Sequence, residues 1–262
     1  MGSSRKRAAG PGGFSGSALK YIAMCSMLLD HIGVVILERI VYYRGGLEQI
    51  ARLMTSDWGG VLYALSRVLR TAGRLAFPIY CFLLVEGFLH TRDWRRYWVR
   101  LAAFALISEL PFSLAVYNQW VGRSHNVFFE LAAGLLVLQG LRQCEALRDP
   151  VRQAGGAAVI CAGCAAACLM RADYDLDGIL IISAFYLLRE RRLPQALAGC
   201  GLSFLDSMEQ SYGAGALAAF PILLYNGRKG ETRWKYVFYW FYPLHLLLLF
   251  IIRRFLIGIP LE

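Results

Sequence analysis

The chain has 262 residues, of which 57% are hydrophobic and 18% are charged, and its formal net charge is +10. Soluble domains are about 45–50% apolar, so this composition excludes an ordinary soluble domain and indicates an integral membrane protein. A basic balance is typical of the cytoplasmic loops of such proteins. No stretch combines aromatic and basic residues into a surface for stacking bases, so we expect no nucleic-acid partner.

The first 17 residues, MGSSRKRAAGPGGFSGS, are rich in glycine, serine and basic residues, which predicts a disordered cytoplasmic tail. Residues 18–262 are predicted to form a single all-α domain, a polytopic transmembrane helix bundle of about nine spans (eight to ten). The spans are expected at residues 19–41, 72–90, 97–117, 126–143, 153–171, 176–189, 194–208, 211–226 and 235–257. The sixth and seventh are short, so eight spans plus a re-entrant element is the alternative.

Residues 42–71 are expected to form an outer loop with a helix of its own. The segment WGGVLYALSRVLRTAG places its large apolar residues on one side, which is typical of a helix lying in the membrane interface. With the N-terminus in the cytoplasm, most Lys and Arg fall in inner segments, and the short outer loops carry acidic residues instead. We therefore predict a cytoplasmic N-terminus and a multi-pass protein of the bacterial inner (cytoplasmic) membrane.

The first span contains an aspartate–histidine pair, Asp30 and His31, near its centre. Ionisable groups inside a bilayer cost roughly 2.5–3.5 kcal/mol each on insertion scales, so they usually face the bundle interior and usually have a function. Adjacent residues of a helix point about 100° apart and need not touch. A nearby carboxylate still raises the basicity of an imidazole, so we expect His31, supported by Asp30, to be a general base.

A second histidine, His245, lies near the centre of the last span, in WFYPLHLLL. Pro243 precedes it and frees a backbone carbonyl about one turn earlier. Helices interrupted in this way often line cavities when polar groups lie beside the kink. We expect His245 to lie at a depth similar to that of His31 and to act with it.

Further polar residues lie within or beside the expected spans. They are Arg74, Glu86, Glu109, Asn126 and Glu130. Each of them is expected either to form a structural ion pair or to contact the substrate. The outer segment RADYDLDG, with Asp173, resembles a calcium loop but lacks the downstream glutamate, and we expect no metal.

The chain resembles the TraX family, named for an integral membrane protein of conjugative plasmids that N-acetylates pilin. The segments that carry this resemblance are ALKYIAMCSMLLDHIG, GRLAFPIYCFLLVEGFLHT, ALISELPFSL, HNVFFELAAGLL, ADYDLDGIL, FPILLYNGRKG and KYVFYWFYPLHLLLL. That family is similar in turn to a superfamily of transmembrane acyltransferases, which transfer an acetyl group from cytoplasmic acetyl-CoA to an acceptor. One branch has a basic residue, ten further residues and then a histidine, and Lys20 and His31 keep that spacing.

The resemblance implies acetyl-CoA as acyl donor, His31 as the catalytic histidine and Lys20 near the CoA phosphates. It also implies a partner among membrane lipids and an acceptor that is a protein N-terminus such as that of pilin, a glycan or a lipid headgroup. His245 or Tyr242 would donate to the developing oxyanion, and an acetyl-histidine relay is an alternative. From the matching segments we add Asp173 and Asn226 to the candidate substrate-binding residues.

Two other classes of protein compete with the enzyme. A haem protein would use His31 and His245 as axial ligands. A proton-coupled transporter would use Asp30, Glu86 and Glu109 as a relay of carboxylates across the membrane.

Overall fold

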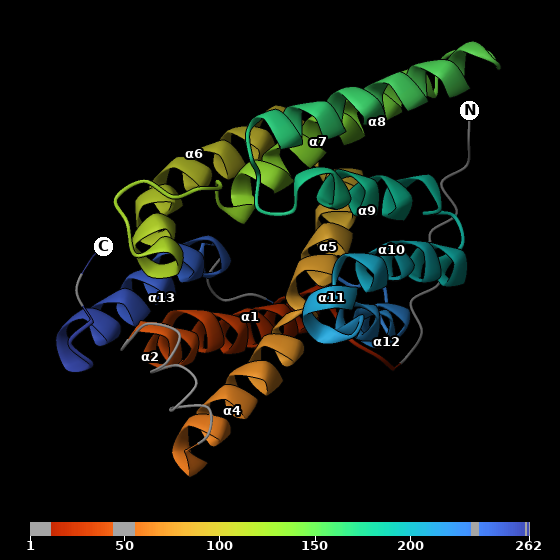
Figure 1. Cartoon of the computed structure of the whole chain (residues 1–262). Coiled ribbons are helices and arrows are strands. Elements are labelled where there is room, and N and C mark those ends of the chain that lie inside the picture. The colour runs from red at the N-terminus through yellow and green to blue at the C-terminus, as the bar shows by residue number, and fades with distance from the viewer. Residues whose placement is uncertain (1–11, 44–55, 232–235, 260, 262) are drawn as a thin grey trace.

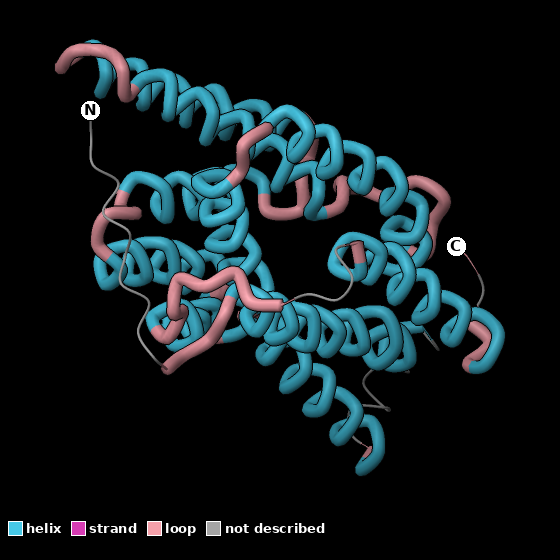
Figure 2. Tube along the Cα trace, turned by 180° about the vertical axis from the view of Figure 1, so that it is seen from behind, coloured by secondary structure: helices cyan, strands magenta, loops and turns pink. Residues whose placement is uncertain are grey.

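The computed structural model describes residues 12–43, 56–231, 236–259 and 261, and over these residues the chain is helical, with two isolated β-bridges and no strand. Figures 1 and 2 show the helices packed side by side around α5, with α7 and α8 along one edge and α1, α4 and α13 along the other. The expected all-α bundle is confirmed. Of the predicted tail, residues 1–11 lie outside the described residues, and α1 begins at Gly16.

The helices follow one another in the following order along the chain. They are α1 (Gly16–Ile32), η1 (Gly33–Leu37), α2 (Glu38–Tyr43), α4 (Asp57–Gly73), α5 (Ala76–His90), α6 (Trp94–Phe112), η2 (Ser113–Tyr117), α7 (Val127–Cys144), α8 (Val151–Leu169), α9 (Asp175–Leu187), α10 (Arg192–Asp206), α11 (Met208–Ser211), η3 (Ala214–Ala218), α12 (Ala219–Leu223), α13 (Val237–Ile251) and η4 (Ile252–Leu256).

Six segments of the described chain are long and apolar enough to cross a membrane: Gly16–Val41, Trp58–His90, Trp94–Tyr117, Val127–Cys144, Val151–Leu169 and Val237–Leu256. The predicted count of about nine is therefore not confirmed. At about 1.5 Å per residue, the 13 residues of α9 and the 15 of α10 fall short of a hydrocarbon core about 30 Å thick. The predicted orientation of the N-terminus stays a prediction.

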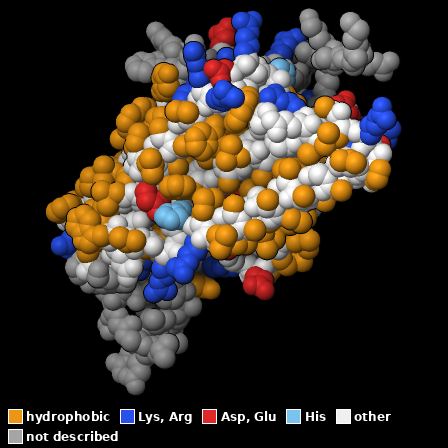
Figure 3. Space-filling model, turned by 90° about the horizontal axis from the view of Figure 1, so that it is seen from above, with side chains coloured by type: hydrophobic (Ala, Val, Ile, Leu, Met, Phe, Trp, Pro, Cys, Tyr) orange, Lys and Arg blue, Asp and Glu red, His pale blue; other side chains and the backbone are white. Residues whose placement is uncertain are grey.

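The outer surface agrees with a membrane protein. Figure 3 shows hydrophobic side chains over the middle of one face, with Lys and Arg gathered towards its top and bottom edges. Large apolar side chains such as Leu106, Leu169 and Phe220 are more than two-thirds exposed. Exposed apolar area on this scale needs a lipid or protein partner, which supports the multi-pass arrangement.

Helices α4 and α5 form nearly one continuous helix that crosses α1 and packs against it, as Figure 1 shows. The helix expected within residues 58–73 is present as α4, and its contact with α1 is close. A Cβ atom at Gly73 would lie 2.2 Å from the Cβ atom of Asp30, so only glycine allows this approach. The Ser26 hydroxyl donates to the carbonyl of Ala72 at 2.6 Å beside it. An interfacial location of α4 stays a prediction.

The substitution Gly73→Ala is expected to destabilise the protein by about 1–3 kcal/mol, because overpacking forces two backbones apart. Gly201 in α10 is the matched control, since a Cβ atom there would meet nothing within 4 Å. Gly201→Ala is expected to be neutral or to stabilise by about 0.5–1 kcal/mol. Thermal unfolding of both purified variants in detergent checks this, and equal midpoints would contradict the close contact.

Three short π-helical segments, η1, η2 and η4, end or interrupt the longest helices. The end of η2 is held by two arginines from other helices. Arg39 donates to the carbonyl of Val116 at 2.7 Å. Arg253, which is fully buried, donates to the carbonyls of Ala115 and Leu114 and to the side chain of Asn118, all within 2.7 Å. Helix ends leave carbonyl groups without partners, and these guanidinium groups satisfy them.

Candidate active site

The sequence places His31 on the buried face of α1. Leu19, Ala23, Met27 and His31 follow one another at intervals of four residues, and all four are at most 9% exposed. Residues four apart lie on the same side of a helix. Asp30 is offset from this face by about 100°. The same logic places His245 on the buried face of α13, between buried Tyr242 and Leu249.

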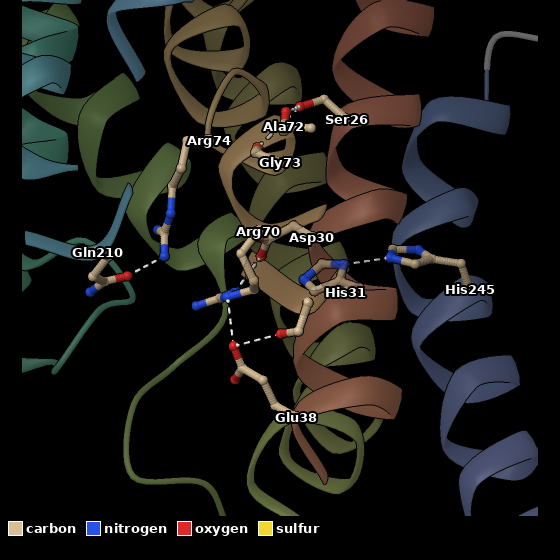
Figure 4. Close-up of polar contacts among 11 residues, drawn as sticks. Ser26, Asp30, His31, Glu38, Arg70, Ala72, Gly73, Arg74, Gln210 and His245 are labelled. Carbon is tan, nitrogen blue, oxygen red and sulfur yellow. Dashed lines mark hydrogen bonds and ion pairs between the residues drawn. The ribbon is translucent and has the colours of Figure 1, made fainter. Parts of the chain in front are cut away.

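The two histidines meet at the interface of α1 and α13. Their side chains are hydrogen-bonded, with 2.7 Å between Nδ1 of His31 and Nε2 of His245. Figure 4 shows the two rings facing one another from their separate helices. Residues 214 positions apart in the chain thus form one buried pair.

The hydrogen-bond partners fix which nitrogens carry hydrogen. Nδ1 of His245 lies 2.7 Å from the carbonyl oxygen of Phe241, which can only accept, so this nitrogen is the donor. In a neutral His245 the other nitrogen, Nε2, then accepts from Nδ1–H of His31. A neutral His31 therefore keeps an unprotonated Nε2, and no described residue donates to it. This tautomer, assigned from the partners, is the form that can accept a proton.

Aromatic rings enclose the pair. Tyr242 is 3% exposed and presents its ring edge-on to His31, with 5.9 Å between ring centroids, and to His245, with 5.8 Å. Phe241 stacks on His245 at 4.6 Å. The Tyr242 hydroxyl also interacts with the backbone of Val127, the first residue of α7. Packing of this kind holds both imidazoles in fixed orientations.

Asp30 does not contact His31, in line with the angle of about 100° between adjacent helical positions, and its carboxylate has other partners. One carboxylate oxygen of Asp30 pairs with Arg70 of α4 at 2.8 Å, and Arg70 also approaches Glu38 at 3.4 Å. Figure 4 shows this group on the side of α1 that faces away from His245. The physical reason is the angle between neighbouring helical positions, which sends Asp30 towards α4 and His31 towards α13.

Arg74 and Asp173 belong to the same region. Arg74 hydrogen-bonds to Gln210, as Figure 4 shows, and it interacts electrostatically with Asp30, Asp173 and Asp206. Arg74 therefore joins the charges around Asp30, and none of its interactions among the described residues involves Glu86, Glu109 or Glu130, the other ionisable residues listed with it from the sequence. Asp173 also interacts electrostatically with Tyr242.

Glu109 and Asn126 form a second polar cluster. Glu109 accepts from the side chain of Asn126 at 2.6 Å and lies 2.7 Å from Nδ1 of His125. Asn126 is fully buried, caps α7 by accepting from the amide of Phe128, and donates to the carbonyl of Ala105. These bonds join α6 to the start of α7, so the contacts of Asn126 are structural.

Lys20 and Asn226 lie beside the beginning of α1, and this is a third group. Lys20 lies over the ring of Phe238, 4.9 Å from its centroid, and interacts electrostatically with Lys229. Asn226 donates to the carbonyl of Gly13 and shapes the loop of residues 226–230. The amide of Gly16 donates to the carbonyl of Arg228, which holds this basic loop against α1.

The contacts support neither the haem protein nor the proton-coupled transporter. Two metal–imidazole bonds of about 2 Å need nitrogens about 4 Å apart, and the facing nitrogens of His31 and His245 are 2.7 Å apart, which does not fit a haem between them. Asp30, Glu86 and Glu109 do not contact one another among the described residues. Glu86 lies near the end of α5, and no described residue donates a hydrogen bond to its carboxylate.

Sequence reasoning missed Arg70 as the partner of Asp30. A signal was present, because Arg70 and Arg74 are four residues apart and therefore share a face of one helix. To use this signal, the predicted second span would have had to extend towards the N-terminus and include α4. Gln210 and Asp206 gave no such signal, since each is a polar residue near the end of a short helix.

Comparisons with known proteins agree with this architecture. Residues 15–253 match the family described as TraX protein. A probable fimbrial assembly protein, FimC of serogroup H1 from Dichelobacter nodosus, is 29% identical over 270 residues, which cover 93% of this chain and 97% of that protein. No solved structure matches the chain significantly. Because the family match covers nearly the whole described chain, including both histidines of the buried pair, this protein belongs to the TraX family.

Proposed function

We propose that this protein is a membrane-embedded acyltransferase, which transfers an acetyl group from acetyl-CoA to an amine or hydroxyl acceptor. The observation that carries the proposal is the buried hydrogen-bonded pair of His31 and His245, in which Nε2 of His31 is left as an unpaired base. Acyl transfer needs a base that removes the proton of the acceptor during attack. Membership of the TraX family supports the same chemistry.

In the proposed reaction, Nε2 of His31 takes a proton from the acceptor while the acceptor nitrogen or oxygen attacks the thioester carbonyl carbon. The carbon–sulfur bond then breaks, and the thiolate of CoA takes the proton from His31. The carbonyl oxygen becomes negative in between and needs a donor. Both nitrogens of a neutral His245 are engaged, so the Tyr242 hydroxyl is the better donor of the two candidates.

His245 would act as a positioning residue. Its ring fixes the tautomer of His31, and the Phe241 carbonyl fixes the tautomer of His245 in turn. Other acid–base sites also contain a group that orients the base. In this protein the group is a second imidazole, because Asp30 is paired with Arg70.

The acceptor proposed here is a pilin or fimbrial subunit. The family, and a relative named as a probable fimbrial assembly protein, support a role in pilin processing. The donor would enter from the beginning of α1. Lys20 precedes His31 by eleven residues, about 16 Å along a helix, which the extended pantetheine arm of CoA can bridge. Lys20, Arg228 and Lys229 would then hold the CoA phosphates.

The test is the release of CoA from acetyl-CoA by purified protein in detergent, with saturation by acetyl-CoA as the first readout. Saturable CoA release that is absent from an equally folded His31→Ala sample would support the acyltransferase. Folded wild-type protein that neither binds acetyl-CoA nor releases CoA would refute it.

Lys20→Ala is expected to raise the KM for acetyl-CoA about 5- to 150-fold with little change in kcat, because a charge-assisted contact to phosphate contributes about 1–3 kcal/mol to binding. Lys20→Arg keeps the charge and should retain most of the affinity. Steady-state kinetics at varied acetyl-CoA distinguishes these cases. A loss confined to kcat would show that Lys20 does not bind the phosphates.

A further inference from the structure

Three arginines follow one face of α4. Arg67, Arg70 and Arg74 are spaced three and four residues apart, so their side chains leave the helix on the same side. At about 100° per residue, the exposed apolar residues of α4 lie on roughly the opposite side, and they are Trp58, Val61, Leu65 and Val68. The apolar side suits lipid. The arginine side is turned instead towards α1 and α11, which both pack against α4.

Arg67 and Arg74 converge on one exposed residue of α11, Gln210. Arg67 donates to the main-chain carbonyl of Gln210, and Arg74 donates to the side-chain oxygen of the same residue. Within the described parts of the chain, neither guanidinium forms an ion pair. A guanidinium matches a carboxylate in charge and geometry and can bind it through two parallel bonds. Gln210 offers only neutral oxygens, so it is a replaceable partner.

Arg74 keeps donors that no described residue accepts. Its Nε is enclosed by protein and has no hydrogen bond to the described chain, and a buried donor in this state is costly. Asp173 and Asp206 interact electrostatically with Arg74, but neither forms an ion pair or a hydrogen bond with it. The guanidinium of Arg74 therefore retains hydrogen-bonding capacity for an anionic ligand.

Arg70 holds the arginine face against α1. Its Nη1 pairs with Asp30 at 2.8 Å and its Nε approaches Glu38 at 3.4 Å, whereas its Nη2 donates to no described residue. The stem of Arg70 crosses Gly33, where an added Cβ atom would lie 3.1 Å from Cγ of the arginine. Contacts with two carboxylates and with the backbone of η1 thus fix this guanidinium in one position and leave one of its nitrogens open.

The arginine face lies next to the proposed base. Asp30, which pairs with Arg70, directly precedes His31 in α1. Figure 4 shows the guanidinium groups of Arg70 and Arg74 between Gln210 and α1. The residue proposed for the CoA phosphates, Lys20, is eleven residues away from His31 along the same helix. A group bound by the arginines would therefore belong to the acceptor and not to the phosphates of the donor.

We propose that Arg67 and Arg74 bind a carboxylate of the acceptor, and that Gln210 occupies this site until the acceptor arrives. This inference rests on the proposed function and narrows its substrate class. The acceptor would be a peptide that carries an acidic side chain within a few residues of the amine to be acetylated. Its carboxylate replaces the oxygens of Gln210, and its amine is held towards His31. Neutral peptides lack the first of these contacts.

The test compares acceptor peptides with full-length protein in detergent, following peptide-stimulated CoA release. One peptide amide begins with alanine and has glutamine at each of the following four positions, and four others carry a single glutamate at one of them. The readout is the ratio of kcat/KM between the best acidic peptide and the neutral one. For the wild type we expect a ratio of about 10 to 150, the contribution of one charge-assisted hydrogen bond.

Arg67→Gln and Arg74→Gln are each expected to lower this ratio about tenfold, and the double variant should bring it near one. The ratio compares two peptides in the same sample, so it reports lost binding of the carboxylate and not a general loss of activity. Arg96→Gln is the matched control. It also removes one arginine, but Arg96 is exposed at the start of α6 and pairs with Asp93 of its own turn, so the wild-type ratio should remain.

Gln210 gives the sharper test, since its substitution changes the occupant of the site and leaves the arginines in place. Gln210→Ala should raise the ratio about 2- to 10-fold, because the acidic peptide no longer displaces a side chain. Gln210→Glu should lower the ratio to near one, since a carboxylate attached to α11 occupies the site at high effective concentration. Gln210 is exposed, so both variants should fold, and a merely structural role of Gln210 predicts no such opposite shifts.

A wild-type ratio near one, or wild-type protein that no peptide stimulates, would overturn the proposal. Folded arginine variants or a Gln210→Glu variant that keep the wild-type ratio would do the same. A raised KM for acetyl-CoA in Arg74→Gln, equal with both peptides, would assign the arginines to the donor and also overturn it. In all these cases, CoA release that depends on His31 would leave the acyltransferase standing. Folded wild-type protein that releases no CoA, with or without peptide, would instead show that the proposed function has failed.

Discussion

Replacing His31 by alanine is expected to reduce CoA release about 10²- to 10⁴-fold, the contribution usual for a positioned general base. His31 is the member of the buried pair whose free nitrogen faces no donor among the described residues, so no neighbour can replace it. Expression should change little, whereas the stability in detergent should fall by about 1–3 kcal/mol, because Nε2 of His245 loses its donor; activities are therefore compared at temperatures where both proteins are folded. CoA release at constant protein concentration measures the loss, and undiminished release would remove His31 from the mechanism.

His90 gives this experiment a matched control. Like His245, it places Nδ1 near a backbone carbonyl four residues earlier, that of Glu86 at 2.8 Å, but its side chain is exposed and far along α5 from the pair. His90→Ala should keep full activity. His245→Ala should lose activity in part, and His245→Gln should restore some of it, since the glutamine carbonyl can accept from Nδ1–H of His31. Such rescue would distinguish positioning of His31 from simple filling of space.

Replacing Arg253 by methionine is expected to destabilise the protein by at least about 3 kcal/mol, because each buried acceptor left without a donor costs about 1–3 kcal/mol. Three acceptors are affected, the carbonyls of Leu114 and Ala115 and the side chain of Asn118. Methionine keeps much of the volume, so the loss would report hydrogen bonding and not a cavity. The thermal midpoint in detergent measures the effect.

The neighbouring arginine is the control for this variant. Arg254 is partly exposed and makes no hydrogen bond to a described residue, so Arg254→Met should be nearly neutral. Arg253→Lys should fall between the two, because an ammonium group cannot reach all three acceptors in the plane of a guanidinium. Equal midpoints for Arg253→Met and Arg254→Met would show that the cap on η2 contributes nothing to stability.

Hydrophobic patterning was sufficient to predict most of the fold. The helices α1, α6, α7, α8 and α13 correspond to expected spans, because about 20 apolar residues in a row leave few alternatives. The pattern failed at α9 and α10, since it cannot distinguish a short helix buried among others from one that crosses the bilayer. It also missed the continuity of α4 and α5, because α4 carries Arg67 and Arg70, which lower its hydropathy.

The members of the site were predictable, but only some of its pairings were. Buried histidines in apolar helices stand out because they are costly there, and the sequence also indicated that His245 acts with His31, with which it is hydrogen-bonded. The partner of Asp30 depends on helix rotation and on which helices are neighbours, and neither follows from one sequence. That partner is Arg70. The catalytic roles themselves stay predictions.

The pairing of α1 with α13 has a consequence for biogenesis. A nascent chain meets the membrane helix by helix, and α1 would be inserted long before α13 has been synthesised. Until then Asp30 and Arg70 can already pair, whereas His31 lacks the ring that sets its tautomer. Without α13 the chain lacks both this ring and the proposed oxyanion donor Tyr242, so full activity would be reached only when the last helix inserts. Incomplete chains would then consume little acetyl-CoA.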